Sequence, residues 1–314
     1  MNERLQNLLR SVAANRVVAR LLKYTEGLKY MDSRVWDHEG GNRRIYEAVL
    51  SASPVAIGKL GSCELGAIRS CLRYHRHQKF EDLTIAHRQS LFTNAGVFPD
   101  NCDTLEKFTT LIVRHVLPEM DLMGVWFNIG EARIVKKYCQ NPMPVRLGSF
   151  SAYLWSFPWT KALKGKRVLV VHPFVKTIRL QFLRRHYVWP NNPEMLPEFE
   201  LDLLQVPVSP ALMAPKYESW FETLDALKNE MGKKDFDIAL IGAGAYSLPL
   251  VVHAKHLGKI GIHTGGETQF FFGIKGGRWD YHPLYNVFYN DYWIRPLPEE
   301  TSPNNKVIEN GCYW

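Results

Sequence analysis

Four short segments of the chain carry charged or polar side chains directly after an apolar run typical of a buried strand, and three of them contain glycine turns. Glycines allow sharp turns that expose backbone amides, and the N-terminus of a following helix favours a negative group. Binding of a phosphate-bearing molecule is therefore the chemistry that these segments suggest. The residues that we expect to contact the ligand are Lys59, Gly61, Ser62, His172, Lys176, Thr177, Gly242, Gly244, Tyr246, Gly265, Gly266, Gln269, Lys275 and Arg278.

Two glutamates in these segments are candidate catalytic groups. Glu64 follows the glycine turn at 58–61, and Glu267 follows Gly265 and Gly266. A carboxylate at a strand exit can hold a metal ion or act as a general base. A structural alternative stays open for the first segment, because Ser62 would also serve as a helix N-cap and Glu64 as a favourable acid in the first turn.

The turn from Gly242 to Ser247 is similar to a dinucleotide-binding turn, but Ser247 stands where the third glycine is expected. No acidic residue follows about 20 positions later, where a partner for the ribose 2′-OH would stand. The pattern therefore argues against a redox dinucleotide. Phosphate or ribose binding and a plain packing turn stay open as alternatives, and for His172 so does a purely structural role.

Strands and helices of regular length must position these segments. We expect strands at 55–61, 166–174, 199–207, 236–244 and 259–266, and helices at 42–52, 63–75, 104–123, 131–139, 177–186, 216–232 and 247–258. This alternation predicts an α/β fold with a Rossmann-like, mostly parallel sheet flanked by helices and preceded by an N-terminal helical segment. Ligands of such sheets bind at the carboxyl ends of the strands, so the four segments are expected to share one site.

The chain divides into three expected regions. Helices occupy 1–53, an α/β catalytic domain 54–280, and an aromatic-rich strap 281–314, with a candidate internal boundary in the proline- and glycine-bearing stretch 140–150. Aromatic rings in the tail could pack on a sugar, but a strap that packs across the domain is the favoured interpretation.

The amino-acid composition indicates a globular protein, and the net charge indicates an anionic ligand. Hydrophobic residues make up 46% and charged residues 22% of 314, an ordinary globular composition. Five cysteines without a CxxC pair argue against a zinc site or a disulfide framework. The formal net charge of +8 attracts anions, and without a zinc finger or an aromatic RNA-binding motif we expect a nucleotide diphosphate rather than nucleic acid.

Residues 3–24 are predicted to form a basic amphipathic helix. Such a helix can lie on an anionic membrane surface, but packing on its own domain or on a second subunit is the favoured alternative. The N-terminus lacks a secretion signal, and no apolar run reaches the roughly 18 residues of a membrane span. We therefore expect a cytoplasmic protein, with peripheral contact at the inner face of a membrane as an open alternative.

The order of these motifs resembles glycosyltransferases of the GT-D fold, a small bacterial family first described as a domain of unknown function. Its members carry an arginine–x–glycine–aspartate–x–glutamate segment at the first strand exit, which the residues from Lys59 to Glu64 match. Near the end they carry a strand, a glycine turn, a helix, a second strand and further glycines, which Ile241 to Phe272 match in order and spacing. The resemblance covers residues 54–280.

The resemblance implies an enzyme that moves a sugar from a nucleotide-diphosphate donor to a glycan or lipid-linked acceptor in polysaccharide or glycoconjugate biosynthesis. In the family, the aspartate and glutamate would bind Mn²⁺ and the sugar diphosphate. Ser62 replaces that aspartate here, so Glu64 alone is carried over as a candidate ligand of Mn²⁺ or Mg²⁺. Gly266 and Thr268 fall where the family has a late histidine and aspartate.

Three alternatives to a metal-dependent transferase stay open. A metal-independent enzyme would neutralise the diphosphate with Lys59, Lys176 or Arg278. An S-adenosylmethionine-dependent methyltransferase would use the turn at 242–246, and a non-catalytic basic binding module would keep the fold without the reaction.

Overall fold

A seven-stranded sheet forms the centre of the protein in the computed structural model, which describes residues 16–30, 35–208 and 215–314. Neighbouring strands pair in parallel, in the order β3-β2-β1-β7-β6-β4-β5. The strands are β1 (Val55–Lys59), β2 (Leu122–Val125), β3 (Met143–Arg146), β4 (Arg167–His172), β5 (Glu200–Gln205), β6 (Ile238–Ile241) and β7 (Ile260–His263). The predicted α/β, Rossmann-like fold is confirmed.

The strands alternate their side chains between two hydrophobic clusters, because successive residues of a strand point to opposite faces. In β4, Val168 and Val170 belong to one cluster, whereas Leu169 and Val171 belong to the other. All four side chains are fully buried. Both faces of the sheet are therefore covered, which explains why the inner strands β4, β6 and β7 are nearly continuous apolar runs, unlike the edge strand β5.

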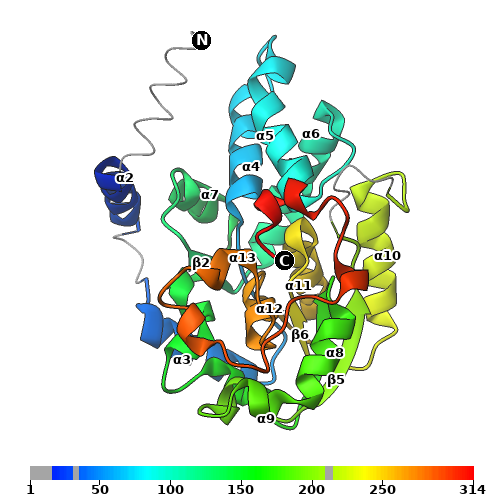
Figure 1. Ribbon diagram of the computed structural model, residues 1–314. Helices are drawn as coiled ribbons and strands as arrows, with labels where there is room; N and C mark the ends of the chain where they lie inside the picture. Colours follow the sequence, from blue (N-terminus) through cyan, green and yellow to red (C-terminus); the bar gives the residue numbers. More distant parts are fainter. Residues whose placement is uncertain (1–15, 31–34, 209–214) are drawn as a thin grey trace.

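Helices pack on both faces of this sheet (Figure 1). The cluster that contains Leu169 includes buried residues of α4, α6, α10 and α11, and the cluster that contains Val168 includes residues of α3, α8 and α12. The helices are α2 (Arg16–Leu28), α3 (His38–Leu50), α4 (Ser62–Tyr74), α5 (Phe80–Ala95), α6 (Cys102–Leu111), α7 (Glu131–Tyr138), α8 (Val175–Leu183), α9 (Arg185–Val188), α10 (Trp220–Gly232), α11 (Ser247–His256), α12 (Glu267–Phe271) and α13 (Gly277–Asp280).

Side-chain caps fix where several helices begin. Asp37 accepts from the amide of Gly40 at 2.7 Å at the start of α3, and Asn101 accepts from Thr104 at 2.8 Å at the start of α6. Ser219 caps α10 in the same way. These side chains satisfy amides that have no partner within the helix.

Two predictions of secondary structure are wrong. The expected helix at 104–123 ends as an α-helix at Leu111, continues as a π-helical turn over Ile112–Val116, and gives way to strand β2. No strand was expected in the segment 140–150, the candidate linker or boundary, but it contains β3, which pairs with β2. Both strands are only four residues long, too short for their alternation to stand out in the sequence.

The first part of the predicted helix at 3–24 lies outside the described residues, and α2 covers the rest and extends to Leu28. Glu26 attaches α2 to the domain, because its carboxylate is buried and accepts a hydrogen bond from the amide of Ala132 at 3.1 Å. Leu21 and Tyr24 remain 58% and 66% exposed. None of the helices within the described ranges is long and apolar enough to cross a membrane.

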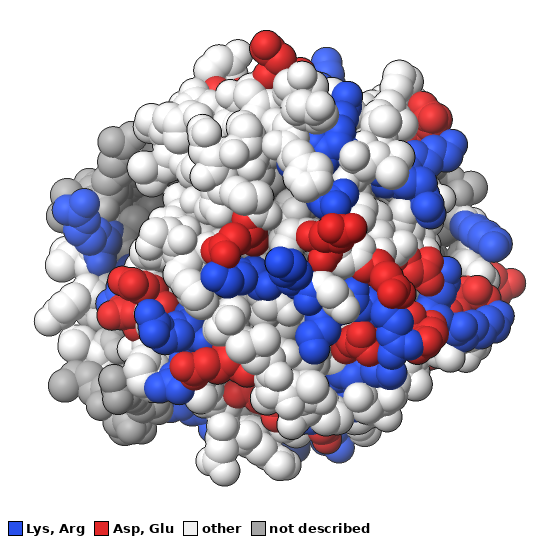
Figure 2. All heavy atoms as spheres, turned by 90° about the horizontal axis from the view of Figure 1, so that it is seen from below, with Lys and Arg blue, Asp and Glu red and all other residues white. Residues whose placement is uncertain are grey.

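Charges of both signs lie side by side on the face shown in Figure 2. Among the described residues, ion pairs such as Lys161 with Glu194 and Lys233 with Glu230, each at 2.6 Å, join opposite charges at the surface. The excess of basic residues is therefore not gathered into one continuous patch on this face.

The tail at 281–314 runs across the front of the molecule in Figure 1, and the C-terminus lies near the centre of that view. Part of its aromatic content is core: Trp293 is 2% exposed, and its ring centroid lies 4.8 Å from that of Phe270 in α12. Tyr281, by contrast, is 94% exposed. We call residues 298–314, the last part of this tail, the strap.

Candidate ligand-binding site

One cavity of about 370 Å³ lies at the carboxyl ends of four adjacent strands, β1, β7, β6 and β4. The strand order explains this, because β7 and β6 insert between β1 and β4 and bring all four predicted exits to one stretch of the sheet edge. The exits contribute Lys59, Gly61, Ser62, Cys63, Glu64, His172, Pro173, Phe174, Gly242, Ala243, Gly244, Tyr246, His263, Gly265 and Gly266 to the lining.

Gly242 allows three of these exits to approach closely. A Cβ at this position would lie 2.6 Å from the carbonyl oxygen of Gly265, 2.6 Å from Oγ1 of Thr268 and 2.8 Å from Cδ2 of His172. These distances are shorter than real carbon contacts, so any other residue would push the ends of β4, β6 and β7 apart. The glycine is required by this approach rather than by its backbone dihedral angles.

Lys59, the last residue of β1, brings a buried positive charge to the cavity. It is 9% exposed, and its Nζ lies 5.7 Å from the ring centroid of Trp126 and 5.8 Å from that of Phe150. Among the described residues it forms no ion pair or hydrogen bond. Burial lowers the pKa of Lys59. The negative charges of Glu267 and Glu64 offset the cost of burying this cation only in part, and an anionic ligand would lower that cost further.

Glu64 lies in the first turn of α4, and its carboxylate folds back over Gly61. A Cβ at residue 61 would overlap Oε2 of Glu64, so the glycine makes room for this carboxylate. Burial raises the pKa of Glu64, and the negative charge of Glu309 raises it further. The group is therefore a stronger base than a solvated glutamate.

His172 and His263 are both neutral in this environment, because burial lowers the pKa of each to about 3. Nδ1 of His172 accepts from the amide of Phe174 at 3.0 Å, which places the proton on Nε2. Nδ1 of His263 donates to the carbonyl oxygen of Ile241 at 3.2 Å, which leaves Nε2 as an acceptor. The two rings thus offer one hydrogen-bond donor and one acceptor without a net charge.

Arg278 supplies a second positive charge to the cavity, from α13. Its Nη2 lies 2.6 Å from Oε2 of Glu309, and its guanidinium lies 4.2 Å from the ring centroid of Tyr313. Burial alone would lower the pKa of Arg278, but Tyr313, Cys312 and Glu309 together raise it. The cation is therefore held firmly in its charged form, next to residues of the strap.

Two predicted contact residues, Lys176 and Thr177, lie at the N-terminus of α8 and do not line the cavity. Their amides donate to the carboxylate of Glu300 at 2.7 and 3.0 Å, and Oγ1 of Thr177 donates to the same group at 2.5 Å. Nζ of Lys176 faces Glu299 at 3.7 Å. A carboxylate of the strap thus occupies the position at which we expected a phosphate.

Three further predicted residues also lie outside the lining. Gln269 is buried, and its Nε2 donates to the carbonyl oxygens of Lys275 and Tyr313 at 3.0 and 2.7 Å. Nζ of Lys275 lies 5.3 Å from the ring centroid of Tyr289. Glu267, the second predicted catalytic group, accepts a hydrogen bond from Ser151 at 3.1 Å. Gln269 therefore supports the strap, while Lys275 and Glu267 contact other parts of the fold.

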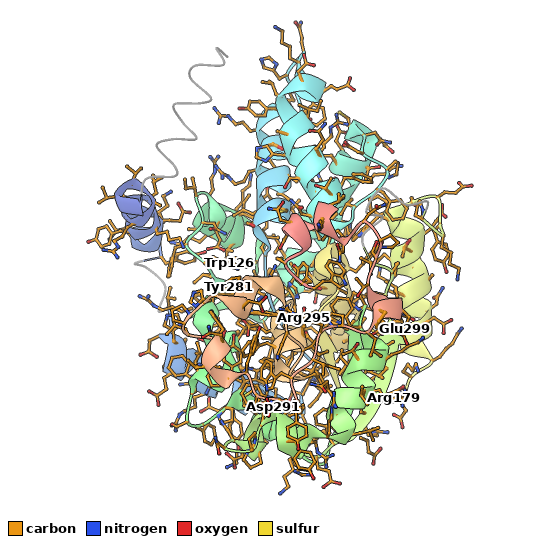
Figure 3. All side chains as sticks on the ribbon, in the orientation of Figure 1. Trp126, Arg179, Tyr281, Asp291, Arg295 and Glu299 are labelled. Carbon is orange, nitrogen blue, oxygen red and sulfur yellow. The ribbon has the colours of Figure 1, made fainter. Side chains whose placement is uncertain are left out.

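Several lining residues were not selected from the sequence. Trp126, labelled in Figure 3, follows strand β2, whose first two residues fall within the helix expected at 104–123. Asn94, Ala95 and Gly96 come from the end of α5, and Ile308, Glu309, Tyr313 and Trp314 come from the strap. The strap contacts depend on how the tail crosses the sheet edge, for which the sequence carries no local signal.

The side chains of this site do not form a binding site for a metal ion by themselves. No three His, Cys, Asp or Glu side chains of the described chain are grouped so that they could hold one. Ser62 supplies no carboxylate beside Glu64, so the aspartate–glutamate pair that the resemblance implies is incomplete. The positive charges that an anionic ligand would meet in the cavity are Lys59 and Arg278.

Taken together, the cavity offers two cations, a neutral donor, a neutral acceptor and one basic carboxylate around a space the size of a small ligand. No family model, no curated protein and no solved structure matches the chain. Its function is accordingly inferred from these residues and their arrangement.

Proposed function

We propose that the protein is a nucleotide-sugar-dependent glycosyltransferase, which moves a sugar from a nucleotide-diphosphate donor to a glycan or lipid-linked acceptor. The observation that carries the proposal is the meeting of four strand exits, three of which have glycine turns, around one cavity that contains Lys59, a buried cation without an ion pair to any described residue. The volume of about 370 Å³ lies within the usual range for small-molecule sites, roughly 300–1,000 Å³.

The charges of the cavity suit a diphosphate. Lys59 and Arg278 would balance its negative charge, and the Nε2 proton of His172 would donate a neutral hydrogen bond. In a reaction that releases a nucleotide diphosphate, negative charge develops on the leaving oxygen. Buried cations that are already in place stabilise such charge more than solvent does.

Glu64 is the group that we assign as general base. In the transfer, the oxygen of an acceptor hydroxyl bonds to the anomeric carbon, and the bond from that carbon to the diphosphate oxygen breaks. The hydroxyl proton passes to the carboxylate of Glu64, whose raised pKa makes it a more effective base near neutral pH.

The test has a binding arm and a turnover arm. A panel of UDP-, GDP- and dTDP-sugars is screened by thermal shift, and cleavage of the donor that binds best is then followed with time. Glu64→Gln should keep the thermal shift but reduce turnover by about 100-fold or more, as expected for loss of a general base. Glu106→Gln, which changes an exposed glutamate of α6, should match the wild type.

Two outcomes would contradict the proposal. One is the absence of stabilisation by every sugar nucleotide together with binding of S-adenosylhomocysteine in a calorimetric titration. The other is binding of a sugar nucleotide without any turnover by the wild type, which would favour a binding module, whereas unchanged turnover in Glu64→Gln would overturn only the assignment of Glu64 as general base.

A further inference from the structure

The mouth of the cavity contains an ion pair between the domain and the strap. Nη2 of Arg278 contacts Oε2 of Glu309 at 2.6 Å, and Sγ of Cys312 lies within hydrogen-bond distance of both side chains, at 2.9 and 3.3 Å. The other terminal nitrogen, Nη1, faces the turn after β7, since a Cβ at Gly266 would lie 2.9 Å from it. Arg278 therefore has one side toward the strand exits and one side engaged by a carboxylate.

The backbone that presents Glu309 is strained. Glu309 and Asn310 have φ values of 47° and 57°, in the left-handed region that residues with a side chain rarely adopt. The following residue, Gly311, continues in the same region at 74°. Outside glycine, such a conformation persists where neighbouring contacts maintain it, and it is concentrated at functional sites. The contacts here are the ion pair with Arg278 and the hydrogen bond from the amide of Glu309 to Oδ1 of Asn94 at 3.2 Å.

On either side of this strained turn, hydrogen bonds attach the strap to the domain independently of Glu309. On one side, the buried carboxylate of Glu300 accepts three hydrogen bonds at the start of α8. On the other side, the carbonyl oxygen of Trp314 accepts from the amide of Gly277 at 3.0 Å. Motion of Glu309 away from Arg278 therefore requires no release of the strap as a whole.

We propose that Glu309 determines the charge specificity of the cavity by holding the place at Arg278 that a phosphate group of the ligand takes over. This inference rests on the proposed function, because it assumes that the cavity binds a diphosphate. A ligand with a phosphate exchanges one anionic partner of Arg278 for another, whereas an uncharged ligand of the same shape leaves the ion pair in place. The negative charge of Glu309 opposes every anion that enters, so its removal strengthens the binding of anions alone.

The experiment compares two neutralising substitutions on the same strap. Glu309→Gln removes the charge at the cavity mouth, and Glu299→Gln removes a charge beside α8 that does not line the cavity. Figure 3 places Glu299 on the opposite side of Arg295 from Trp126, which does line it. The probes are inorganic pyrophosphate, UDP and GDP, with the uncharged nucleosides uridine and guanosine as controls, and dissociation constants are measured by titration calorimetry.

Glu309→Gln should bind pyrophosphate about tenfold more tightly than the wild type, the effect expected for removal of one nearby like charge at about 1.4 kcal/mol. Glu299→Gln should stay within about twofold of the wild type, and nucleoside binding should change in neither variant. Glu309→Ala provides a second variant in which the carboxylate is absent, and it should show the same gain.

The outcomes separate the two proposals. If the wild type binds pyrophosphate or a nucleoside diphosphate and Glu309→Gln binds it no more tightly, the role of Glu309 is overturned while the proposed function stands. If neither the wild type nor any variant binds an anion, the proposed function fails, and the role of Glu309 fails with it. An equal gain in Glu299→Gln would show a general charge effect and would also overturn the assignment.

Discussion

The two edges of the central sheet differ in whether their lysine side chains have ion-pair partners. At the amino edge, Arg167 binds Asp237 at 2.6 Å and also Asp235, and Lys255 binds Asp121 at 3.0 Å. At the carboxyl edge, Arg278 pairs with Glu309 of the strap, but Lys59 is buried without an ion pair to any described residue, and His172 and His263 are buried as neutral rings.

This difference predicts that the charges at the amino edge contribute to stability, whereas Lys59 at the carboxyl edge contributes to ligand binding. The ion pairs at the amino edge join residues at or near the starts of the strands. At the carboxyl edge, Glu267 and Glu64 offset the cost of burying Lys59 only in part, since burial still lowers its pKa, and such a cost is typical of residues kept for binding rather than for stability. The comparison can be tested by making the same kind of change at each edge.

The largest expected effect comes from replacing a lysine by methionine at each edge. Lys59→Met should weaken the binding of a nucleoside diphosphate about 100-fold, because the cavity loses its buried cation, while the free energy of unfolding rises by about 1–3 kcal/mol. Lys255→Met should lower the free energy of unfolding by about 1 kcal/mol and leave binding unchanged, since it removes contacts to Asp121 and to the carbonyl oxygen of Glu119.

Urea denaturation gives the stabilities for this pair, and calorimetry gives the affinities. A Lys59→Met protein that is less stable and binds the ligand as well as the wild type would show that Lys59 is a structural residue.

A second test uses glycine substitutions inside and outside the cavity. Gly242→Ala should lower the free energy of unfolding by about 1–3 kcal/mol, because its Cβ would press on Gly265, Thr268 and His172. Gly232→Ala, at the end of α10, has no atom within 4 Å of the added carbon and should be neutral or slightly stabilising. Thermal and chemical denaturation of both variants check this, and an equally tolerated Gly242→Ala would argue against close contact of the strand exits.

The third and smallest effect concerns pH. The pKa of His172 is about 3 in the fold and ordinarily 6.5, so between these values the unfolded chain binds a proton that the folded chain does not. Stability therefore decreases as pH falls through this range, by about 1.4 kcal/mol per pH unit for this histidine. His172→Asn keeps an acceptor for the amide of Phe174. Its free energy of unfolding should therefore fall less steeply with decreasing pH than that of the wild type.

The difference between variant and wild type is the quantity to measure, because other groups titrate nearby with the opposite sign. Burial raises the pKa of Glu131 to about 7, for example, so its folded form gains protons over part of the same range. Urea denaturation of both proteins at pH 5, 5.5, 6 and 6.5 gives the two slopes, and parallel slopes would mean that His172 is solvated. At the amino edge, Arg167 lowers the pKa of Asp237 below its ordinary 3.8, so its contribution is lost only at more acid pH.

The parts of the site that directly follow an apolar run and a glycine turn could be predicted from the sequence. The strand before Gly61 and the strand before Gly242 are short apolar runs, but each is followed by a glycine turn and a helix, so both their positions and their shared edge could be predicted. Lys59 and the residues from Gly61 to Glu64 line the cavity for this reason. The adjacency of β1, β7, β6 and β4 follows from the strand order, which the alternation of elements does not specify.

Features that depend on distant contacts could not be predicted in this way. Thr177 follows a strand and begins a helix, as expected, but Glu300 comes from far along the chain to occupy that helix N-terminus. Trp126 was missed because β2 is only four residues long and directly follows a helical segment. Glu309 was missed because nothing near it in the sequence indicates that it meets Arg278.

The late position of β7 in the chain has a consequence for biosynthesis. Ile260 pairs with Val55 of β1 on one side and with Ile238 of β6 on the other, so β7 alone joins the two halves of the sheet. Until the ribosome has released this segment, each half keeps an unpaired inner edge of apolar strand. Such edges readily pair with other chains, so a nascent or truncated polypeptide that stops before residue 260 is expected to aggregate.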